Sequence, residues 1–455
     1  MRRTITVVMF SAMVVFGFSA RPVRAAEPAG LRVATFHADV TPPPGSFIYG
    51  LQRLETIEHP LLAKGIVLED GRRRYVLCSV DYCLLSNGTH TMFRRKLAEA
   101  AGTDLACVAV QTTHVHTAPL VDQGVAEILE AIQDPPAYYD LALYETIADR
   151  LAAAVAASLN GLQPFDQVGM GQAKVERVAS SRRVPDAAGT LHWRGSSSGK
   201  RAELRALPEG NIDPFLKTIT LARDGKPLVR MHYYATHPQT FYRDGRASYD
   251  FVGMAREALQ EKEDVFQVYF TGCAGDVAAG KYNDGTPEAR QALYERLLAG
   301  MEAAVASTAW MPAERPEWRT APVLLPPRSD AGQSAADRRA KLLDEKVQPF
   351  MRTWHARRLA FAQRADQPIE LSLLRIGRVH IVHLPGEPML EYQWYAQRLR
   401  PDDFVAVAGY GEGSPSYICT ERAFTEGGYE PAASAVGPES EGSLKAAIRQ
   451  LLGVE

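Results

Sequence analysis

The sequence has little cysteine and no closely spaced cysteine pair. Its 455 residues include only five cysteines, namely Cys78, Cys83, Cys107, Cys273 and Cys419. Because no Cys-x-x-Cys motif is present, a zinc site built from thiolates is not expected. An odd number also leaves at least one thiol unpaired within the chain if disulfides form. Cys78 and Cys107 lie in apolar, strand-like runs, where we expect them to be small core residues.

The sequence also lacks an excess of charge of either sign. Lysine and arginine number 51 against 53 aspartates and glutamates, which gives a formal net charge of -2. We therefore expect no electrostatic attraction to nucleic acid. There is no Walker loop, no Rossmann glycine fingerprint, no nucleophile elbow and no internal repeat. These absences mean that other residues must indicate the function.

Long apolar runs are missing after the N-terminus. The run 5–20 follows Arg2 and Arg3 and leads to small residues at Ala25 and Ala26. This pattern is typical of a signal peptide, and no later stretch reaches about 18 uncharged apolar residues. We predict a signal peptide at 1–26, one catalytic domain at 27–455, and an exported protein, periplasmic or secreted. We expect no stable membrane insertion after cleavage; an uncleaved anchor or a lipoprotein is the alternative.

What the sequence does contain is an alternation of strand and helix patterns. Strand patterns occur at 31–40, 65–69, 74–80, 106–111, 168–179, 215–222, 228–234, 265–270, 369–376, 379–384 and 404–408, and helical patterns at 91–101, 138–159, 251–262, 287–306, 335–361, 390–399 and 444–452. This order predicts an α/β fold with mixed sheets layered with helices. The polar segment 189–205 is expected to be a mobile surface loop, and 335–361 a solvated pair of helices rather than a site.

The segment 108–119 carries the strongest indication of a functional site. Its first half is apolar and β-branched, whereas its second half contains two histidines and ends at Pro119. Open α/β sheets bind ligands at such strand ends. On an extended backbone, His114 and His116 point to the same side, with Val115 opposite, so both rings can converge on a metal or a reacting oxygen. The alternative is a pair of hydrogen-bonded surface histidines.

Polar residues follow several other predicted strands. His237 ends the strand 228–234 and precedes Pro238, Asp276 follows the strand 265–270, and Glu387 follows the strand 379–384. Since metal ligands usually come from separate elements, this repetition favours a metal site. Asp276 is expected either to orient a histidine or to cap a turn.

Two further segments are candidates for the site. Arg182 and Arg183 precede a loop bounded by Pro185 and are able to clamp a carboxylate or an amide oxygen, unless they form a solvated pair. The segment 409–437 is rich in glycine, serine and tyrosine. A long loop of this kind in a compact domain is more often functional than decorative.

Taken in order, these motifs resemble the neutral (alkaline, non-lysosomal) ceramidases. The matching segments are 113–119 (Thr-His-Val-His-Thr-Ala-Pro), 235–237 (Ala-Thr-His), 275–277 (Gly-Asp-Val), 385–387 (Pro-Gly-Glu), the loop with Tyr417 and Tyr429, 38–42 (Ala-Asp-Val-Thr-Pro) and 79–81 (Ser-Val-Asp). The resemblance extends from about Leu31 to the end of the sequence. It implies an α/β catalytic domain that binds one zinc ion and hydrolyses the amide of N-acylsphingosines.

The resemblance also implies roles for individual residues. It gives His114, His237, Glu387 and Tyr417 as zinc ligands. It gives His116 as the second motif histidine, which helps to stabilise the oxyanion. Arg182 matches an active-site arginine, and Tyr429 has the spacing of a further active-site tyrosine, twelve residues after Tyr417. With Asp276, these residues make up the predicted catalytic and metal sites.

The sequence departs from the family pattern at three points. The family's Gln-Ser-Asn segment, whose serine is the assigned nucleophile, is here Thr271-Gly272-Cys273. The asparagine before Arg182 is replaced by Ser181. The β-rich C-terminal domain of the ceramidases has no counterpart in these 455 residues. Because the serine is missing, we favour direct attack by metal-activated water, and we expect Cys273 to be structural.

These observations predict an exported, zinc-dependent amidohydrolase acting on a small-molecule or lipid-like N-acyl substrate. One alternative is a zinc hydrolase acting on esters or carbohydrate-linked amides. The other is a non-catalytic exported binding protein with the same fold. Metal content separates this last alternative from the first two, and a substrate screen separates the first two from each other.

Overall fold

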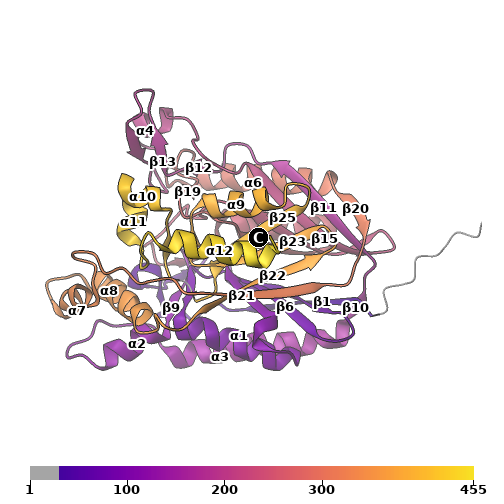
Figure 1. The fold of residues 1–455 in the computed structure, drawn as a ribbon, viewed down its shortest axis with the longest axis horizontal. Helices are drawn as coiled ribbons and strands as arrows, with labels where there is room; N and C mark the ends of the chain where they lie inside the picture. Colours follow the sequence, from indigo (N-terminus) through magenta and orange to yellow (C-terminus); the bar gives the residue numbers. More distant parts are fainter. Residues whose placement is uncertain (1–29, 414, 455) are drawn as a thin grey trace, which may run out of the picture.

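Two β-sheets lie at the centre of the molecule and pack against each other (Figure 1). The computed structural model describes residues 30–413 and 415–454, so the predicted signal peptide lies outside the described residues. The nine-stranded sheet has the order β10 (Gln163–Pro164), β1 (Arg32–Asp39), β5 (Leu62–Glu69), β6 (Arg74–Val80), β8 (Val108–Thr112), β25 (Phe404–Gly411), β23 (Val379–Pro385), β22 (Ile369–Ile376) and β21 (Glu317–Val323). The five-stranded sheet has the order β18 (Phe266–Thr271), β16 (Lys226–Tyr234), β15 (Phe215–Arg223), β11 (Gln167–Lys174) and β20 (Ala309–Pro312).

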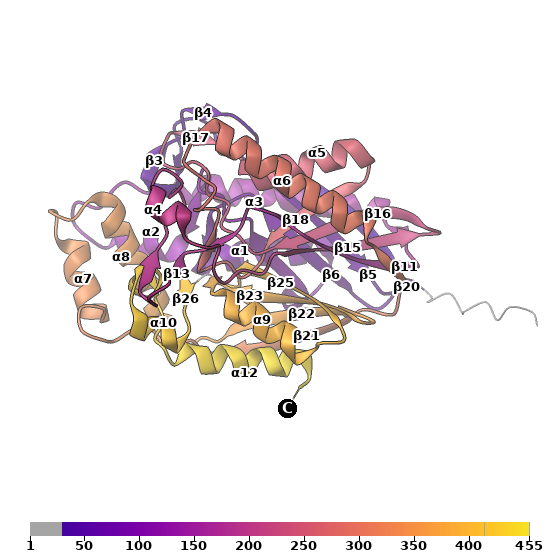
Figure 2. The same cartoon turned by 90° about the horizontal axis from the view of Figure 1, so that it is seen from above.

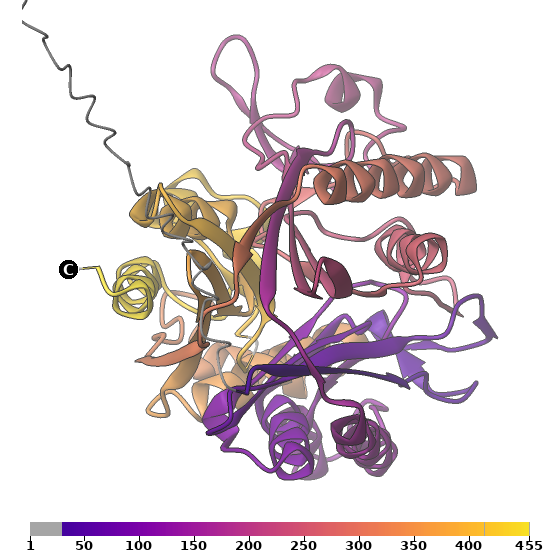
Figure 3. The same ribbon diagram turned by 90° about the vertical axis from the view of Figure 1, so that its right-hand side faces the viewer.

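Helices cover the outer faces of both sheets. Helices α1 (Asn87–Ala101) and α3 (Leu141–Ser158) pack on the β1–β8 half of the large sheet, and α9 (Leu390–Leu399) and α12 (Ser440–Leu452) pack on its other half. Helices α5 (Asp250–Glu263) and α6 (Pro287–Ala306) cover the small sheet. Figures 2 and 3 show these layers from above and from one end. The predicted α/β class, with mixed sheets layered with helices, is therefore confirmed.

The sheets are apolar on both faces because each face is covered. In β5, Ile66 and Leu68 cluster with Val229 and Phe270 of the small sheet. The intervening Val67 belongs to the cluster that contains α1 and α3. Each aliphatic side chain of this kind stabilises the fold by about 1.5–3 kcal/mol when it leaves water. This explains why the strands appear in the sequence as continuous apolar runs.

The connections between strands place their carboxyl ends near one edge. The predicted hairpins β5–β6, β15–β16 and β22–β23 are all present. The pairs β6–β8, β16–β18 and β23–β25 are parallel, so the segments that follow these strands leave the sheets on the same side. Short elements gather there, among them β7 (Leu84–Ser86), β9 (Leu120–Asp122), β12 (Ser180–Ser181), β19 (Val277–Ala278), β24 (Glu387–Pro388), β26 (Tyr417–Ile418), α10 (Glu421–Glu426) and α11 (Tyr429–Ala433).

Two sequence predictions need correction. The segment 189–205 is not simply a surface loop, since it contains β14 (Leu191–Trp193) and leads into α4 (Ala202–Ala206). Its Arg194 side chain is buried and donates hydrogen bonds to the carbonyls of Ser181, Leu204 and Pro208, which organises the backbone around it.

The second correction concerns the pair α7 (Ala335–Leu343) and α8 (Pro349–Ala362). A helical pair is present as predicted, but its charged residues are not all solvated. Arg338 of α7 and Arg352 and Arg358 of α8 are buried, and α8 packs on α2 (Gln123–Glu130). Figure 1 shows both helices at the same end of the molecule as α10 and α11. Among the described residues, no helix is both long and apolar enough to span a bilayer.

A buried ion pair supports the segment that leads to His114. The guanidinium of Arg256 in α5 donates to both carboxylate oxygens of Asp81, at 2.9 and 2.8 Å, and neither side chain is exposed. Asp81 also accepts hydrogen bonds from Leu62 N and from the hydroxyl of Thr113, the residue before His114. The pair therefore connects α5 to the end of β8.

We expect Arg256→Met to lower the free energy of unfolding by about 3–5 kcal/mol, because it leaves the Asp81 carboxylate buried without its cation. Urea unfolding followed by circular dichroism measures this change. Arg246→Met is the matched control, since Arg246 pairs with Asp244 and Glu58 with its side chain 31% exposed. The control substitution should lower the free energy of unfolding by about 0–1 kcal/mol. Equal losses in both variants would contradict the predicted role of the buried pair.

Candidate metal centre and active-site cavity

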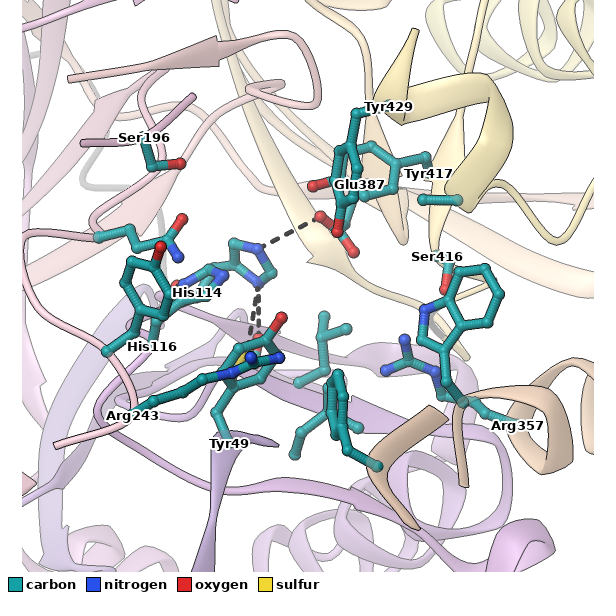
Figure 4. A pocket seen from close by; sticks show the side chains of 18 of the residues that line it. Tyr49, His114, His116, Ser196, Arg243, Arg357, Glu387, Ser416, Tyr417 and Tyr429 are labelled. Atoms are coloured by element: carbon teal, nitrogen blue, oxygen red, sulfur yellow. Dashed lines mark hydrogen bonds and ion pairs between the residues drawn. The ribbon is translucent and has the colours of Figure 1, made fainter. Parts of the chain in front are cut away.

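A cavity of about 470 Å³ opens at the edge where the strand ends meet (Figure 4). Most of the predicted site residues line it, namely His114, His116, Arg182, Glu387, Tyr417 and Tyr429. His114 follows β8, and Glu387 follows β23. His237, which follows β16, lies against His114 and Glu387 without lining the cavity itself. Residues that are far apart in the sequence are thus brought together by the sheet topology.

His114, His237 and Glu387 form a buried group of potential metal ligands. Their nearest ligand atoms all lie within 4.8 Å of one another. Oε2 of Glu387 lies 3.3 Å from Nε2 of His114 and 3.4 Å from Nε2 of His237. Cys83, His114 and His116 form a second, overlapping group. Two imidazoles and one carboxylate are a ligand set that suits zinc.

The hydrogen bonds of the two imidazoles define their orientation. Nδ1 of His114 lies 2.8 Å from the carbonyl of Cys83, and Nδ1 of His237 lies 2.6 Å from the carbonyl of Ala274. A carbonyl only accepts, so each Nδ1 carries the proton and each Nε2 presents a lone pair. Nε2 of His114 is buried without a hydrogen-bond partner. The lone pairs on the two Nε2 atoms and the negative charge of the Glu387 carboxylate repel one another. A bound cation would remove this repulsion, so the group fits a metal ion.

Burial and mutual proximity shift the pKa values in this group. Burial lowers the pKa of His237 to about 4, which keeps its ring neutral. Burial alone would raise the pKa of Glu387, but positive charge at His114 and His237 holds that pKa well below 4.5. With both rings neutral, a bound cation would have to supply that charge. Neutral imidazoles and an ionised carboxylate are the protonation states in which these residues bind metal.

The backbone at His114 differs from the extended conformation predicted from the sequence. His114 has a φ of +68°, in the left-handed region, so the chain turns there instead of continuing β8. The two rings still lie close, with centroids 4.7 Å apart and planes at 84°. The two histidines are therefore close, as predicted, but the predicted cause, an extended strand with alternating side chains, is wrong. A residue other than glycine rarely adopts a positive φ, and such positions gather at functional sites.

Tyr417 lies beside Glu387 because their segments pair. In the parallel bridge between β24 and β26, Glu387 is the register partner of Tyr417. The Tyr417 hydroxyl lies 3.4 Å from Nε2 of His237 and accepts a hydrogen bond from Arg182 at 3.0 Å. Burial raises the pKa of Tyr417 well above 10, against the opposing charge of Arg182. A phenolic oxygen therefore lies next to the group formed by His114, His237 and Glu387.

Arg182 and Arg183 do not form a solvated pair, so that alternative is wrong. Each is buried, and both pair with the buried carboxylate of Glu430. Nε of Arg182 lies 3.0 Å from Oε1 of Glu430 as an ion pair without hydrogen-bond geometry. These pairs hold α11, where Tyr429 stands half exposed above the cavity with its ring 5.6 Å from that of Tyr417.

Asp276 is not among the residues that line the cavity. Its Oδ1 accepts a hydrogen bond from Leu390 N at 2.8 Å, in the first turn of α9. Its own carbonyl accepts from Arg182 N at 2.7 Å, and the same turn supplies the Ala274 and Val277 carbonyls that hold His237. Asp276 thus positions the backbone around the site, as the capping alternative anticipated.

Several residues of the cavity were not identified from the sequence. Helix α8 contributes Phe350, Met351, Trp354 and Arg357, and loops contribute Tyr49, Ser196, Gln239, Tyr242 and Arg243. Tyr410 stacks on His114 with ring centroids 4.2 Å apart. No local pattern marks these residues, because they reach the site through long-range packing. Only the aromatic content of 409–437 pointed towards Tyr410.

Cys273 is buried in the core near α9 and does not line the cavity. Burial raises the pKa of its thiol well above 9, which disfavours a thiolate nucleophile. We expect Cys273→Ala to keep kcat/KM within about twofold of the wild type, since a structural thiol acts as a small apolar group. Steady-state kinetics of the two proteins, both shown to be folded, tests this expectation. A loss of turnover with unchanged metal content would instead assign the thiol a chemical role.

The fold and the site together define a layered α/β protein with a buried histidine–carboxylate centre. Among solved structures, the chain is similar to neutral ceramidase from Pseudomonas aeruginosa, with a TM-score of 0.66 and 14% sequence identity over 93% of this chain and 75% of the other. It is also similar to a ceramidase complexed with C2, with a TM-score of 0.67 and 14% identity over 93% and 76% of the two chains.

Comparison of sequences alone finds no relative. No protein-family model and no curated protein matches the chain. At 14% identity, the structural similarity establishes the ceramidase fold for this chain. The activity is argued separately, from the residues of the cavity.

Proposed function

We propose that the protein is an exported, zinc-dependent hydrolase that cleaves the amide of an N-acyl compound. The main support is the group formed by His114, His237 and Glu387, in which both imidazoles present Nε2 lone pairs towards one carboxylate. The similarity of the fold to that of the ceramidases favours an amide over other substrates.

The donor set matches zinc better than a harder cation. Two neutral imidazole nitrogens and one carboxylate oxygen would supply the three strong ligands of a catalytic zinc site, with a position for water or substrate beside the phenolic hydroxyl. Zinc bound there would polarise a carbonyl group and lower the pKa of a bound water to about 7. His114, His237 and Glu387 would hold the ion, and Tyr417 would be the weaker fourth ligand.

The remaining cavity residues would handle protons and charge. Burial, with His114 and His237 nearby, lowers the pKa of His116 well below 6.5. Its Nδ1 donates to the His114 carbonyl at 3.0 Å, so its Nε2 offers a lone pair to the cavity. In this tautomer, Nε2 would take a proton from the attacking water and then donate it to the nitrogen of the leaving amine. The Tyr429 hydroxyl would donate to the developing oxyanion, and Arg182 would orient Tyr417.

The test combines metal analysis with a substrate screen. Elemental analysis of the purified protein should give about one zinc per chain, as expected for a single four-ligand site. A short-chain fluorescent N-acyl sphingosine and other N-acyl amines should be hydrolysed faster than the matching esters. Preference for esters or carbohydrate-linked amides would support the second interpretation. Absence of both metal and turnover would support a binding protein.

The acyl-chain preference follows from the size and lining of the cavity. A cavity of about 470 Å³ lined by polar as well as aromatic side chains favours soluble or short-chain substrates over long-chain ceramide. Full burial of each methylene would contribute about 0.8 kcal/mol, or roughly tenfold in kcat/KM for two carbons. We expect less than about threefold for two carbons beyond a short chain. A chain-length series assayed below the aggregation limits measures this, and a steep rise up to long chains would reveal a lipid channel.

Export is proposed from the sequence of the first 26 residues. Expression of the full chain in a bacterial host, followed by fractionation and N-terminal sequencing, should give a periplasmic or secreted protein. Its mature N-terminus should follow Ala25 or Ala26. A full-length product retained in the cytoplasm would contradict the proposal.

A further inference from the structure

Arg357 of α8 presents an unpaired positive charge to the cavity. Its Nε and one terminal nitrogen are buried and have no hydrogen-bond partner among the described residues. Within residues 30–413 and 415–454, the Arg357 side chain also forms no ion pair. Figure 4 shows its guanidinium directed from α8 towards the middle of the cavity, across from His114 and Glu387.

The buried arginines among the described residues each have a partner for at least part of the guanidinium. Arg256 binds both oxygens of Asp81, Arg183 pairs with Glu430, and Arg194 donates to backbone carbonyls. A buried N–H group without a partner costs free energy, and the cost is larger for a charged group. The exceptional state of Arg357 therefore points to a partner that is not part of the chain.

The charges that line the cavity favour an anionic partner. The cationic side chains of the lining are Arg182, Arg243 and Arg357, and Glu387 is the sole carboxylate among the described lining residues. Glu387 is engaged by His114 and His237, and Arg182 is paired with Glu430. Arg243 and Arg357 are thus left without an acidic partner, and a bound divalent cation would add further positive charge.

We propose that Arg357 binds an oxyanion carried by the substrate, so that the preferred substrate is an N-acyl compound with a carboxylate, sulfonate or phosphate group. This inference rests on the proposed hydrolase activity. A guanidinium matches the geometry of such an oxyanion with two parallel hydrogen bonds. The aromatic residues Tyr49, Phe350 and Trp354 line the same cavity and lower its polarity, which strengthens the ion pair. A neutral N-acyl sphingosine would leave Arg357 unpaired.

A kinetic comparison tests the preference directly. N-hexanoyl-β-alanine and N-hexanoyl taurine are compared with N-hexanoyl-β-alaninamide, which has the same acyl chain and no charge; N-hexanoyl phosphoethanolamine is the phosphate arm. We expect the best anionic substrate to exceed the amide by about tenfold or more in kcat/KM, the range of a charged hydrogen-bonded pair. Comparison of the carboxylate, sulfonate and phosphate substrates identifies which oxyanion Arg357 binds best.

Arg357→Gln should remove this preference, mainly by raising KM for the anionic substrate, so that kcat/KM falls about tenfold more for the anionic substrate than for the neutral amide. Arg357→Lys should retain part of it, because the charge remains without the planar fork. Arg339→Gln, an exposed position on the neighbouring α7, is the matched control and should change neither value. Equal rates for anionic and neutral substrates in the wild type would overturn the inference and leave the amidohydrolase proposal intact.

A binding measurement separates the two proposals. The probe is a ketone analogue of N-hexanoyl-β-alanine, in which a methylene replaces the amide nitrogen, together with its primary amide, and both are titrated by calorimetry. The wild type should bind the carboxylate about tenfold more tightly than the amide, and Arg357→Gln should bind both alike. This result without turnover of any substrate would keep the oxyanion site and reject the hydrolase. Equal binding of both probes to the wild type would mean that water alone satisfies Arg357.

Discussion

Replacing His237 with alanine is expected to reduce bound zinc from about one ion per chain to below a tenth of that and to abolish turnover, since a structural ligand of this kind is not replaced by water. His237 is the imidazole held most firmly, with its Nδ1 near the carbonyls of both Ala274 and Val277. Elemental analysis after gel filtration measures the metal content, and circular dichroism checks the fold.

His192→Ala is the matched control for this experiment. His192 lies in β14, pairs with Asp186 and is not part of the metal group. Its replacement should leave both zinc content and kcat unchanged. If His237→Ala retained a full complement of zinc, the assignment of the His114–His237–Glu387 group as the metal centre would be wrong.

Replacing His116 with alanine is expected to have the opposite effect on metal and a comparable effect on rate. His116 lines the cavity, and its Nδ1 is bound by the His114 carbonyl, which leaves its Nε2 available for proton transfer. We expect zinc to remain at about one ion per chain and kcat to fall by about 10²–10³-fold, the usual loss for a general acid–base or oxyanion-stabilising group.

The comparison of the two variants is the decisive measurement. Metal content and kcat are determined on the same preparations, with KM measured to separate binding from chemistry. His116→Gln is a useful second variant, since it keeps a polar side chain next to Tyr49, whose ring lies 4.7 Å from that of His116. If His116→Ala and His237→Ala both lost the metal, the proposed division between ligand and proton carrier would fail.

Local sequence patterns were sufficient for the secondary structure and for the strand-end residues. Helices α6 and α9 begin and end where the sequence predicts, and the three hairpins are all present. Periodicity and turn residues act over a few positions, so they can be read without tertiary information. The same reasoning placed His114, His237 and Glu387 at strand ends, and the packing of the two sheets brings these ends together.

Local patterns failed where the environment of a charge depends on distant segments. The charges of α7 and α8 suggested a solvated pair, yet α8 packs against α2 and lines the cavity. Arg182 and Arg183 suggested a ligand clamp, yet Glu430 neutralises both. A charged residue has the same appearance in the sequence whether water, a carboxylate or a ligand surrounds it.

The sequence by itself determined the α/β architecture and the strand-end histidines and carboxylate, because these depend on hydrophobic periodicity and on the order of elements. Only the tertiary structure decided which nitrogen of each imidazole faces the site, since the carbonyls of Cys83 and Ala274 come from other segments. It likewise decided that Arg182 and Arg183 pair with Glu430, whereas Nε and one terminal nitrogen of Arg357 have no partner among the described residues. Pairing of charges is settled by contacts between residues distant in the chain, which no local pattern encodes.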